Sequence, residues 1–186
     1  MTKLVATRFL WCLIAALPLV LVLGLEALSA RTLAAGFMLA AGLRLLMSGF
    51  RRSAVPVLLA LALLLLALGM LWSNDPRWLR YYPVAVNLTL LLCFALSLCR
   101  GPPVVERLAR LREPELPSAA LSYTRRVTQV WCGFFALNGG AALYTALYSS
   151  LEVWALYNGL LAYLLMGALF GGEWLLRPRV RHSRHA

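Results

Sequence analysis

Acidic residues and histidine are scarce in this chain of 186 residues. Asp and Glu together number 7, and the 2 histidines, His182 and His185, both lie close to the C-terminus. There is no His-x4-Asp acyltransferase pair, no HExxH motif, no paired aspartates and no glycine-rich phosphate loop. These are arrangements by which acyl transfer, metal-assisted hydrolysis and nucleotide chemistry are recognised. The sequence therefore favours a protein that is not an enzyme, and it predicts no cofactor.

Cysteine offers no metal site either. The 4 cysteines lie in apolar runs or at their ends, with no CxxC pair and no histidine nearby: Cys12, Cys93, Cys99 and Cys132. A zinc site requires closely spaced thiolate and imidazole ligands. We therefore interpret the cysteines as small buried hydrophobic residues and predict no metal.

Charge of either sign is sparse. Only 13% of the residues are charged, whereas 62% are hydrophobic, and the mean hydropathy is +0.77. Soluble domains carry roughly a quarter charged residues, so the solvent that suits this composition is lipid. The net charge of +11 could indicate nucleic-acid binding, but the basic residues bracket apolar runs instead of covering a soluble face. This placement is typical of membrane topology signals and argues against a nucleic-acid partner.

Six apolar stretches are long enough to cross a bilayer, which takes roughly 20 residues and at least about 17. Backbone groups in lipid must hydrogen-bond internally, so each stretch is predicted to be helix. The predicted spans are 9–28, 32–50, 55–72, 82–99, 128–148 and 153–176. The chain 1–186 is therefore predicted to be a single all-α membrane domain, a bundle of six transmembrane helices.

The basic residues favour one side of the predicted membrane. Of 18, only Arg31, Arg77 and Arg80 fall on one side, while the N-terminal segment, the 51–52 loop, the 100–127 loop and the 177–186 tail hold most of the others. The positive-inside rule then places both termini, this loop and this tail in the cytoplasm. We expect an aromatic belt at the outer boundary, made of Trp72, Trp78, Tyr81, Tyr82, Tyr148 and Trp154.

A cleaved signal peptide is the alternative for the N-terminal segment. Small residues at 27–30 (ALSA) follow a basic start and an apolar run. The run 9–25 is longer than the 7–15 residues usual for a signal core, so we expect the first span to be retained. Cleavage would instead leave five spans and an N-terminus outside.

The 100–127 loop contains a predicted amphipathic helix within 101–117. Pro103 can begin it and Pro114 must end it. We expect one apolar face and one charged face; the apolar one holds Val104, Val105, Leu108 and Leu111, and the charged one holds Glu106, Arg107, Arg110 and Arg112. Such a helix lies on anionic headgroups, or its arginines at 107, 110 and 112 form a docking surface for a soluble partner.

A second helix is predicted to run without a break from Ser118 to Tyr148. Its length exceeds the bilayer core, so its first turns project into the cytoplasm. Arg125 and Gln129 share a stripe with small residues, whereas Asn138 lies on another side. The small residues of that stripe, which favour close approach of a neighbouring helix, are Cys132, Ala136 and Gly140.

The last span has a similar layout. Tyr157 and Asn158 lie towards its outer end and Glu173 towards its inner end, at the predicted depth of Arg125 and Arg126. An ion pair between the fifth and sixth spans is expected, because an unpaired carboxylate at that depth is costly. Gly167 and Gly171 form a GxxxG motif roughly opposite Asn158, a packing signal through which the chain could form a homo-oligomer.

Two groups of polar residues are candidate sites, and each has two interpretations. Polar groups within a membrane are functional candidates, but Asn and Gln also join helices by hydrogen bonds. The first group either joins helices or lines a substrate cavity; it comprises Asn87, Asn138, Tyr157 and Asn158. The second either locks an interface or binds an acidic headgroup or phosphorylated carrier; it comprises Arg125, Arg126, Gln129 and Glu173.

Three segments resemble a small family of polytopic bacterial inner-membrane proteins. They are YYPVAVN (81–87), ERLARLREPELPSAALSYTRRVTQVWCGFFALNGG (106–140) and WALYNGLLAYLLMGALFGGEW (154–174). Members of that family are often encoded beside fatty-acid-synthase-like genes of aryl-polyene pigment clusters. The family motif falls on Tyr123, Arg125, Arg126, Gln129, Trp131, Asn138, Tyr157, Asn158 and Glu173. The resemblance implies a role in the assembly of an envelope or pigment lipid, and it supplies no mechanism.

We therefore expect a multi-pass protein of the bacterial inner membrane that acts as a non-enzymatic accessory in the assembly or transfer of an aryl-polyene-like or other envelope lipid. Its expected partners are membrane lipid and cytoplasmic acyl-carrier or synthase proteins. One alternative is a small transporter or lipid flippase, which requires Asn87, Asn138 and Asn158 to converge. Another is a membrane-embedded transferase that uses Arg125, Arg126 and Glu173.

Overall fold

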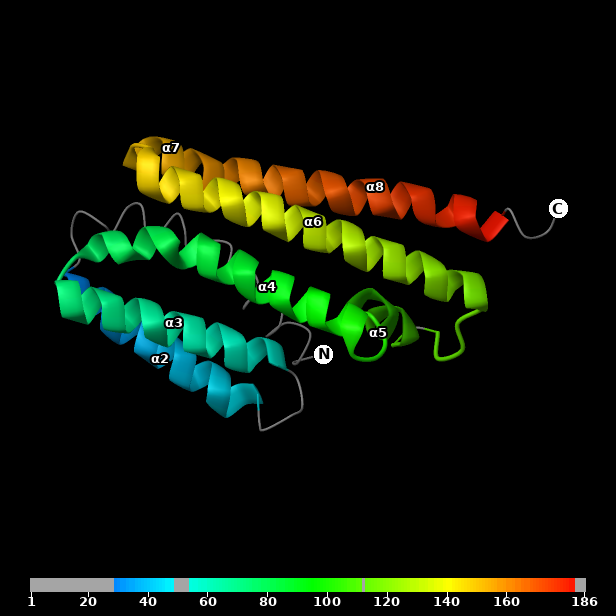
Figure 1. Ribbon diagram of the computed structural model, residues 1–186, viewed down its shortest axis with the longest axis horizontal. Coiled ribbons are helices and arrows are strands. Elements are labelled where there is room, and N and C mark those ends of the chain that lie inside the picture. Colours follow the sequence, from blue (N-terminus) through cyan, green and yellow to red (C-terminus); the bar gives the residue numbers. More distant parts are fainter. Residues whose placement is uncertain (1–28, 49–53, 112, 183–186) are drawn as a thin grey trace, which may run out of the picture. The chain divides into compact units, whose positions relative to one another are not determined.

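The computed structural model describes residues 29–48, 54–111 and 113–182 (Figure 1), and every element in these ranges is helical. The elements are α2 (Ala30–Ser48), α3 (Ala54–Ser73), η1 (Pro76–Tyr81), α4 (Tyr82–Cys99), α5 (Val104–Arg110), α6 (Ser118–Tyr148), α7 (Leu151–Leu156), η2 (Tyr157–Leu161) and α8 (Ala162–His182). Of the two short elements, η1 is a 3₁₀-helix and η2 is a π-helix. The predicted all-α class is confirmed for the described part of the chain.

Four segments of the described chain are long and apolar enough to cross a membrane: Pro56–Ser73, Pro76–Cys99, Ala120–Tyr148 and Leu151–Glu173. They coincide with the predicted third to sixth spans. The predicted second span falls on α2, which is not among the four, and its last two residues lie outside the described ranges, as does the first span (9–28). Six crossings and the side on which the termini lie therefore stay predictions.

The outer surfaces of these helices are strongly apolar. Leu39 is 74% exposed, Leu65 67% and Leu137 79%, and many other leucines of α2, α3, α4 and α6 are exposed as well. Soluble monomers rarely leave apolar patches of such extent open to water. Lipid is the solvent that this surface fits, which indicates a membrane protein.

The described residues fall into two compact units, one ending at Leu147 and one beginning at Tyr148. In the first unit, α2 lies along α3, and α3 lies beside α4 (Figure 1). The α2 and α3 helices bury small side chains that are at most 1% exposed: Ala34, Ala41, Ala60 and Ala67. Small residues allow helix backbones to approach closely where lipid surrounds the pair.

A tight connection joins α3 to α4. Asn74 has a positive φ of 50°, a left-handed conformation that Asn tolerates better than most residues. The Asp75 carboxylate then accepts a hydrogen bond from the backbone N–H of Arg77 at 2.8 Å, and η1 follows with Pro76 in its first turn. The ring of Trp78 packs on Gly69 so closely that an added Cβ would lie 2.6 Å from two ring carbons.

The residues expected in the aromatic belt differ in their exposure. Trp72 and Tyr148 are exposed, as a belt requires. Tyr82 is buried and its ring lies 5.8 Å from that of Phe37, while Trp154 is only 1% exposed. The ring of Tyr82 thus packs against α2 and does not face lipid, and the depth of the expected belt residues in a membrane stays a prediction.

Proline positions set several helix limits as predicted. The α5 helix follows Pro103 and ends before Pro114, and α6 begins directly after Pro117. The α6 helix has the predicted extent of 31 residues. Since an α-helix rises about 1.5 Å per residue, α6 is longer than the roughly 30 Å hydrocarbon core.

Candidate functional site

The centre of the site is an amide pair between α4 and α6. The Asn138 side-chain N–H donates to the Asn87 Oδ1 at 3.0 Å. The Asn87 side-chain N–H in turn donates to the Pro83 carbonyl at 2.8 Å, one turn earlier in α4. Asn87 is 7% exposed and Asn138 6%. The structure thus brings two of the predicted polar residues together, and it uses them to join two helices.

Gly139 of α6 packs against the side chain of Asn87 in α4. A Cβ built on Gly139 would lie 3.1 Å from the Asn87 Cβ, so the backbone of α6 comes close to α4 at this point. Further along the same pair of helices, Phe94 and Phe135 meet edge-to-face with ring centroids 5.2 Å apart. The amide pair, the contact of Gly139 with Asn87 and this ring pair together fix the register of α4 against α6.

We predict a measurable coupling between Asn87 and Asn138. Replacing each by Leu, singly and together, should give a double variant whose loss of unfolding free energy is smaller than the sum of the singles by about 0.6 kcal/mol and at most about 1.7 kcal/mol. Reversible unfolding in mixed micelles of mild detergent and dodecyl sulfate would measure it. The pair Asn87→Leu and Thr128→Val serves as control and should be additive; zero coupling for the two asparagines would contradict the observed bond.

Buried hydroxyl groups of α6 hydrogen-bond to their own helix. Thr128 is fully buried and its hydroxyl donates to the Thr124 carbonyl at 2.8 Å. The Thr145 hydroxyl donates to the Ala142 carbonyl at 3.0 Å. This bonding satisfies a hydroxyl without a partner helix. Sequence reasoning missed Thr128, although its spacing of ten residues from Asn138 places it on a nearby face of α6.

The second unit contains an irregular turn at Asn158. The segment Tyr157–Leu161 is π-helix, and the backbone N–H of Ala162 bonds to the Tyr157 carbonyl. The Asn158 side-chain N–H donates to the Trp154 carbonyl at 2.9 Å, and Asn158 is 5% exposed. Each unit is described by itself, so the predicted convergence of Asn158 with Asn87 and Asn138 stays a prediction.

Arg125 is bound to the end of α4. Its Nη2 donates to the Leu98 carbonyl at 3.2 Å, one of the last carbonyls of a helix, which lack partners inside it. Arg125, Arg126 and Gln129 are exposed, and Glu173 is half-buried in α8 of the second unit. The ion pair expected between Glu173 and the arginines stays a prediction, while the Leu98 contact gives Arg125 a structural role.

A serine connects α4 to α5. The buried Ser97 hydroxyl donates to the Phe94 carbonyl at 2.7 Å and accepts the backbone N–H of Val104 at 3.1 Å. Gly101, with a φ of 104°, makes the turn between the two helices, a conformation that favours glycine. Sequence reasoning missed Ser97, because nothing in the local pattern shows that a hydroxyl in α4 reaches the first turn of another helix.

Glu106 of α5 is buried, although the sequence places it on the charged face of this helix. Glu106 is 8% exposed, and Arg110 binds it with Nη2 at 2.8 Å from the Glu106 Oε1. Leu108 and Leu111 of the expected apolar face are exposed. A carboxylate can be buried here because Arg110 pairs with it, and this pairing turns the leucines outward. Leu108 and Leu111 are thus open to surroundings outside the chain, and the expected contact of this face with headgroups stays a prediction.

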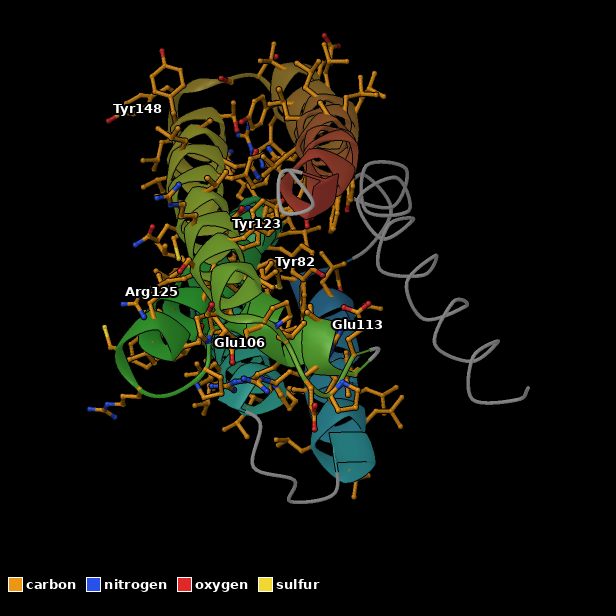
Figure 2. The ribbon with its side chains drawn as sticks, turned by 90° about the vertical axis from the view of Figure 1, so that its right-hand side faces the viewer. Tyr82, Glu106, Glu113, Tyr123, Arg125 and Tyr148 are labelled. Carbon is orange, nitrogen blue, oxygen red and sulfur yellow. The ribbon has the colours of Figure 1, made fainter. Side chains whose placement is uncertain are left out.

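The three arginines of the predicted docking surface have different surroundings. Arg110 is held by Glu106 and by the Pro114 carbonyl, to which its Nη1 donates at 3.1 Å. The Arg107 Nε donates to the Pro102 carbonyl at 2.8 Å, and the residue is exposed. Arg112 lies outside the described residues. Figure 2 labels Arg125 and Glu106 among the side chains of this part of the chain.

In the part of the chain that the structure describes, a Cβ added to Gly140 of the first predicted stripe would meet nothing within 4 Å. Ala136 and Gly140 are exposed, and the close approach occurs at Gly139 instead. Gly167 and Gly171 of the GxxxG motif are exposed, and a Cβ on either would meet nothing within 4 Å. The homo-oligomer contact through Gly167 and Gly171 stays a prediction.

Within the described residues, no three His, Cys, Asp or Glu side chains are grouped so that they could hold a metal ion. Cys93 is buried as expected, whereas Cys99 is exposed. The structure thus defines an all-helical protein with apolar, lipid-compatible surfaces and an internal amide pair. Comparisons with protein-family models, curated proteins and solved structures find no match for this chain.

Proposed function

We propose that this chain is an integral protein of the bacterial inner membrane that assists, without catalysing, the assembly or transfer of an aryl-polyene-like or other envelope lipid. The observation that carries the proposal is the 3.0 Å bond between Asn87 and Asn138. An amide that is bound to a neighbouring helix holds the bundle in register and is not presented to a substrate. The lipid class is supported by the family resemblance of the 106–140 and 154–174 segments.

The proposed topology has six crossings, with both termini and the 100–127 loop in the cytoplasm. It is supported by the concentration of arginine on one side of the apolar runs and by the lipid-compatible surfaces of the helices. Its proposed partners are membrane lipid and the acyl-carrier or synthase proteins that supply the acyl chain. A homodimer through Gly167 and Gly171 is compatible with this arrangement, because that face of α8 is open.

Deleting the gene should separate synthesis of the lipid from its attachment to the membrane. We expect the strain to keep its total pigment acyl chains, to accumulate the free acid, and to lose at least half of the membrane-esterified product. Thin-layer chromatography and mass spectrometry of the two pools would measure this. Unchanged pools in the deletion strain would overturn the proposal.

Complementation distinguishes an accessory from an enzyme. Glu173→Gln and Arg126→Ala, present in the membrane at wild-type level, should restore the esterified pool to within about twofold, whereas a transferase that uses these groups would lose two or more orders of magnitude of its rate. The expected contrast is Asn87→Leu/Asn138→Leu, which should lower the esterified pool because α4 and α6 lose their register. Full loss of product with Glu173→Gln alone would establish the transferase instead.

A lipid flippase is the second candidate, and the π-helical turn around Asn158 is the observation that favours it. Such turns interrupt regular helices and are frequent at functional sites. A flippase predicts that the deletion strain completes the esterified lipid but retains it in the cytoplasmic leaflet. Accessibility of the lipid to a membrane-impermeant reagent applied to spheroplasts would show this distribution, and equal labelling in both strains would exclude it.

A further inference from the structure

The α5 helix lies crosswise at the end of α4. It is seen end-on in Figure 1, where α2, α3 and α4 run lengthwise, and from the side in Figure 2. Cys99 is the last residue of a helix able to cross a membrane, and α5 begins only five residues later, at Val104. A helix that is crosswise to a spanning helix and follows it so closely runs along the membrane surface.

Hydrogen bonds fix α5 in this position. Ser97 binds its first backbone N–H, Arg107 binds the Pro102 carbonyl before it, and Arg110 binds the Pro114 carbonyl after it. Arg125 of α6 holds the end of α4 through the Leu98 carbonyl. The direction of α5, a helix of only 7 residues, is thus set by its bonds to α4 and to the flanking turns.

The outward side of α5 combines apolar and basic groups. Leu108 is 58% exposed and Leu111 81%, and residues three apart share one side of a helix. Arg100, shortly before α5, and Arg107, within it, are also exposed. The acidic residue Glu106 is turned inward and bound by Arg110 at 2.8 Å, so the exposed groups of α5 itself include leucine and arginine but not its one carboxylate.

We propose that α5 is a membrane-surface anchor. Leu108 and Leu111 insert among the acyl chains next to the headgroups, while Arg100 and Arg107 bind the phosphates of anionic lipid. The inference rests on the proposed membrane location of the chain. An acidic soluble protein is the other occupant to consider; its carboxylates would pair with the arginines, but they would not cover the exposed Leu108 and Leu111. Anionic lipid satisfies both the leucines and the arginines, because it offers an apolar layer directly beneath its negative charge.

Spin labels on the full-length protein test directly whether α5 contacts the membrane surface. The 4 native cysteines are replaced by Ala, and one cysteine is introduced at Leu108, Leu111, Glu115 or Leu137. Each labelled protein is placed in nanodiscs of phosphatidylcholine alone or with about one third phosphatidylglycerol. We expect the labels at 108 and 111 to be reached by oxygen at least twice as readily as by a water-soluble nickel chelate, and only with phosphatidylglycerol. The Glu115 label serves as the water-exposed control.

The Leu137 label separates this inference from the proposed membrane location. Leu137 is 79% exposed within a helix able to span a membrane, so its label should favour oxygen in both nanodiscs. If it does and the labels at 108 and 111 behave like that at 115, the membrane contact of α5 is disproved while the membrane location of the chain stands. A soluble partner is then the ligand of α5. If the labels at 108 and 111 prefer oxygen over the nickel chelate equally with and without phosphatidylglycerol, the binding of anionic headgroups is disproved. Adding Arg107→Ala should reduce the phosphatidylglycerol effect at least twofold.

Discussion

Gly139→Val is expected to reduce the unfolding free energy by on the order of 1–3 kcal/mol more than Gly140→Val. A Cβ on Gly139 would lie 3.1 Å from the Asn87 Cβ, which is closer than an ordinary carbon–carbon contact of about 3.5–4.0 Å. Val adds two more methyl groups, so α4 must move away from α6 or the Asn87 side chain must move away from residue 139. Either movement lengthens the bond between Asn87 and Asn138.

Gly140 is the matched control for this experiment. It is the next residue of the same helix, and a Cβ there would meet nothing within 4 Å. The two substitutions change intrinsic helix propensity equally, so their difference reports the contact with α4. Unfolding midpoints in mixed micelles would measure the difference. Equal midpoints would show that α4 and α6 do not approach each other at Gly139.

Gly69→Ala is expected to destabilise the protein, whereas Gly42→Ala is expected to stabilise it. Ala favours helix over Gly by about 0.8–1.0 kcal/mol, and at Gly42 a Cβ would meet nothing within 4 Å. At Gly69 the Cβ would lie 2.6 Å from two ring carbons of Trp78. The ring must leave its place, at a cost on the order of 1–3 kcal/mol that exceeds the gain in propensity. The opposite signs can be read from thermal unfolding of the purified protein in detergent.

Removing the ring should abolish the effect of the added methyl group. In a Trp78→Ala background, Gly69→Ala should cost nothing further, because residues in contact are not additive. If the two single losses instead add up in the double variant, the ring of Trp78 does not rest on Gly69. Trp78→Ala alone is expected to destabilise the turn by the burial that the ring loses.

Much of the fold could be predicted from the sequence, because prolines and long apolar runs act locally. Pro103, Pro114 and Pro117 limit α5 and α6 as expected, and the 82–99 run coincides with α4. The stripes of α6 were also separable by helical spacing: Asn138 is buried, whereas Arg125 and Gln129 are exposed. These features depend on the helical repeat and on the missing N–H of proline.

The partners of the polar groups could not be predicted in this way. Asn87 and Asn138 are 51 residues apart, and only the packing of α4 on α6 shows that their amides meet. The pattern of α5 placed Glu106 on the charged face, but its carboxylate is buried and paired with Arg110. Arg125 was expected to meet a headgroup or Glu173, and its described contact is the Leu98 carbonyl. Such choices depend on tertiary contacts that periodicity does not encode.

The π-helical turn at Tyr157–Leu161 changes how α8 must be drawn on a helical wheel. An α-helix advances about 100° per residue, and a π turn accommodates an extra residue. A wheel of constant pitch started at Val153 therefore runs out of phase by about one residue beyond Leu161. Gly167, Gly171 and Glu173 all follow that point, so their azimuths should be plotted from Ala162. Cysteine pairs chosen to cross-link two copies of α8 will meet only if this offset is included.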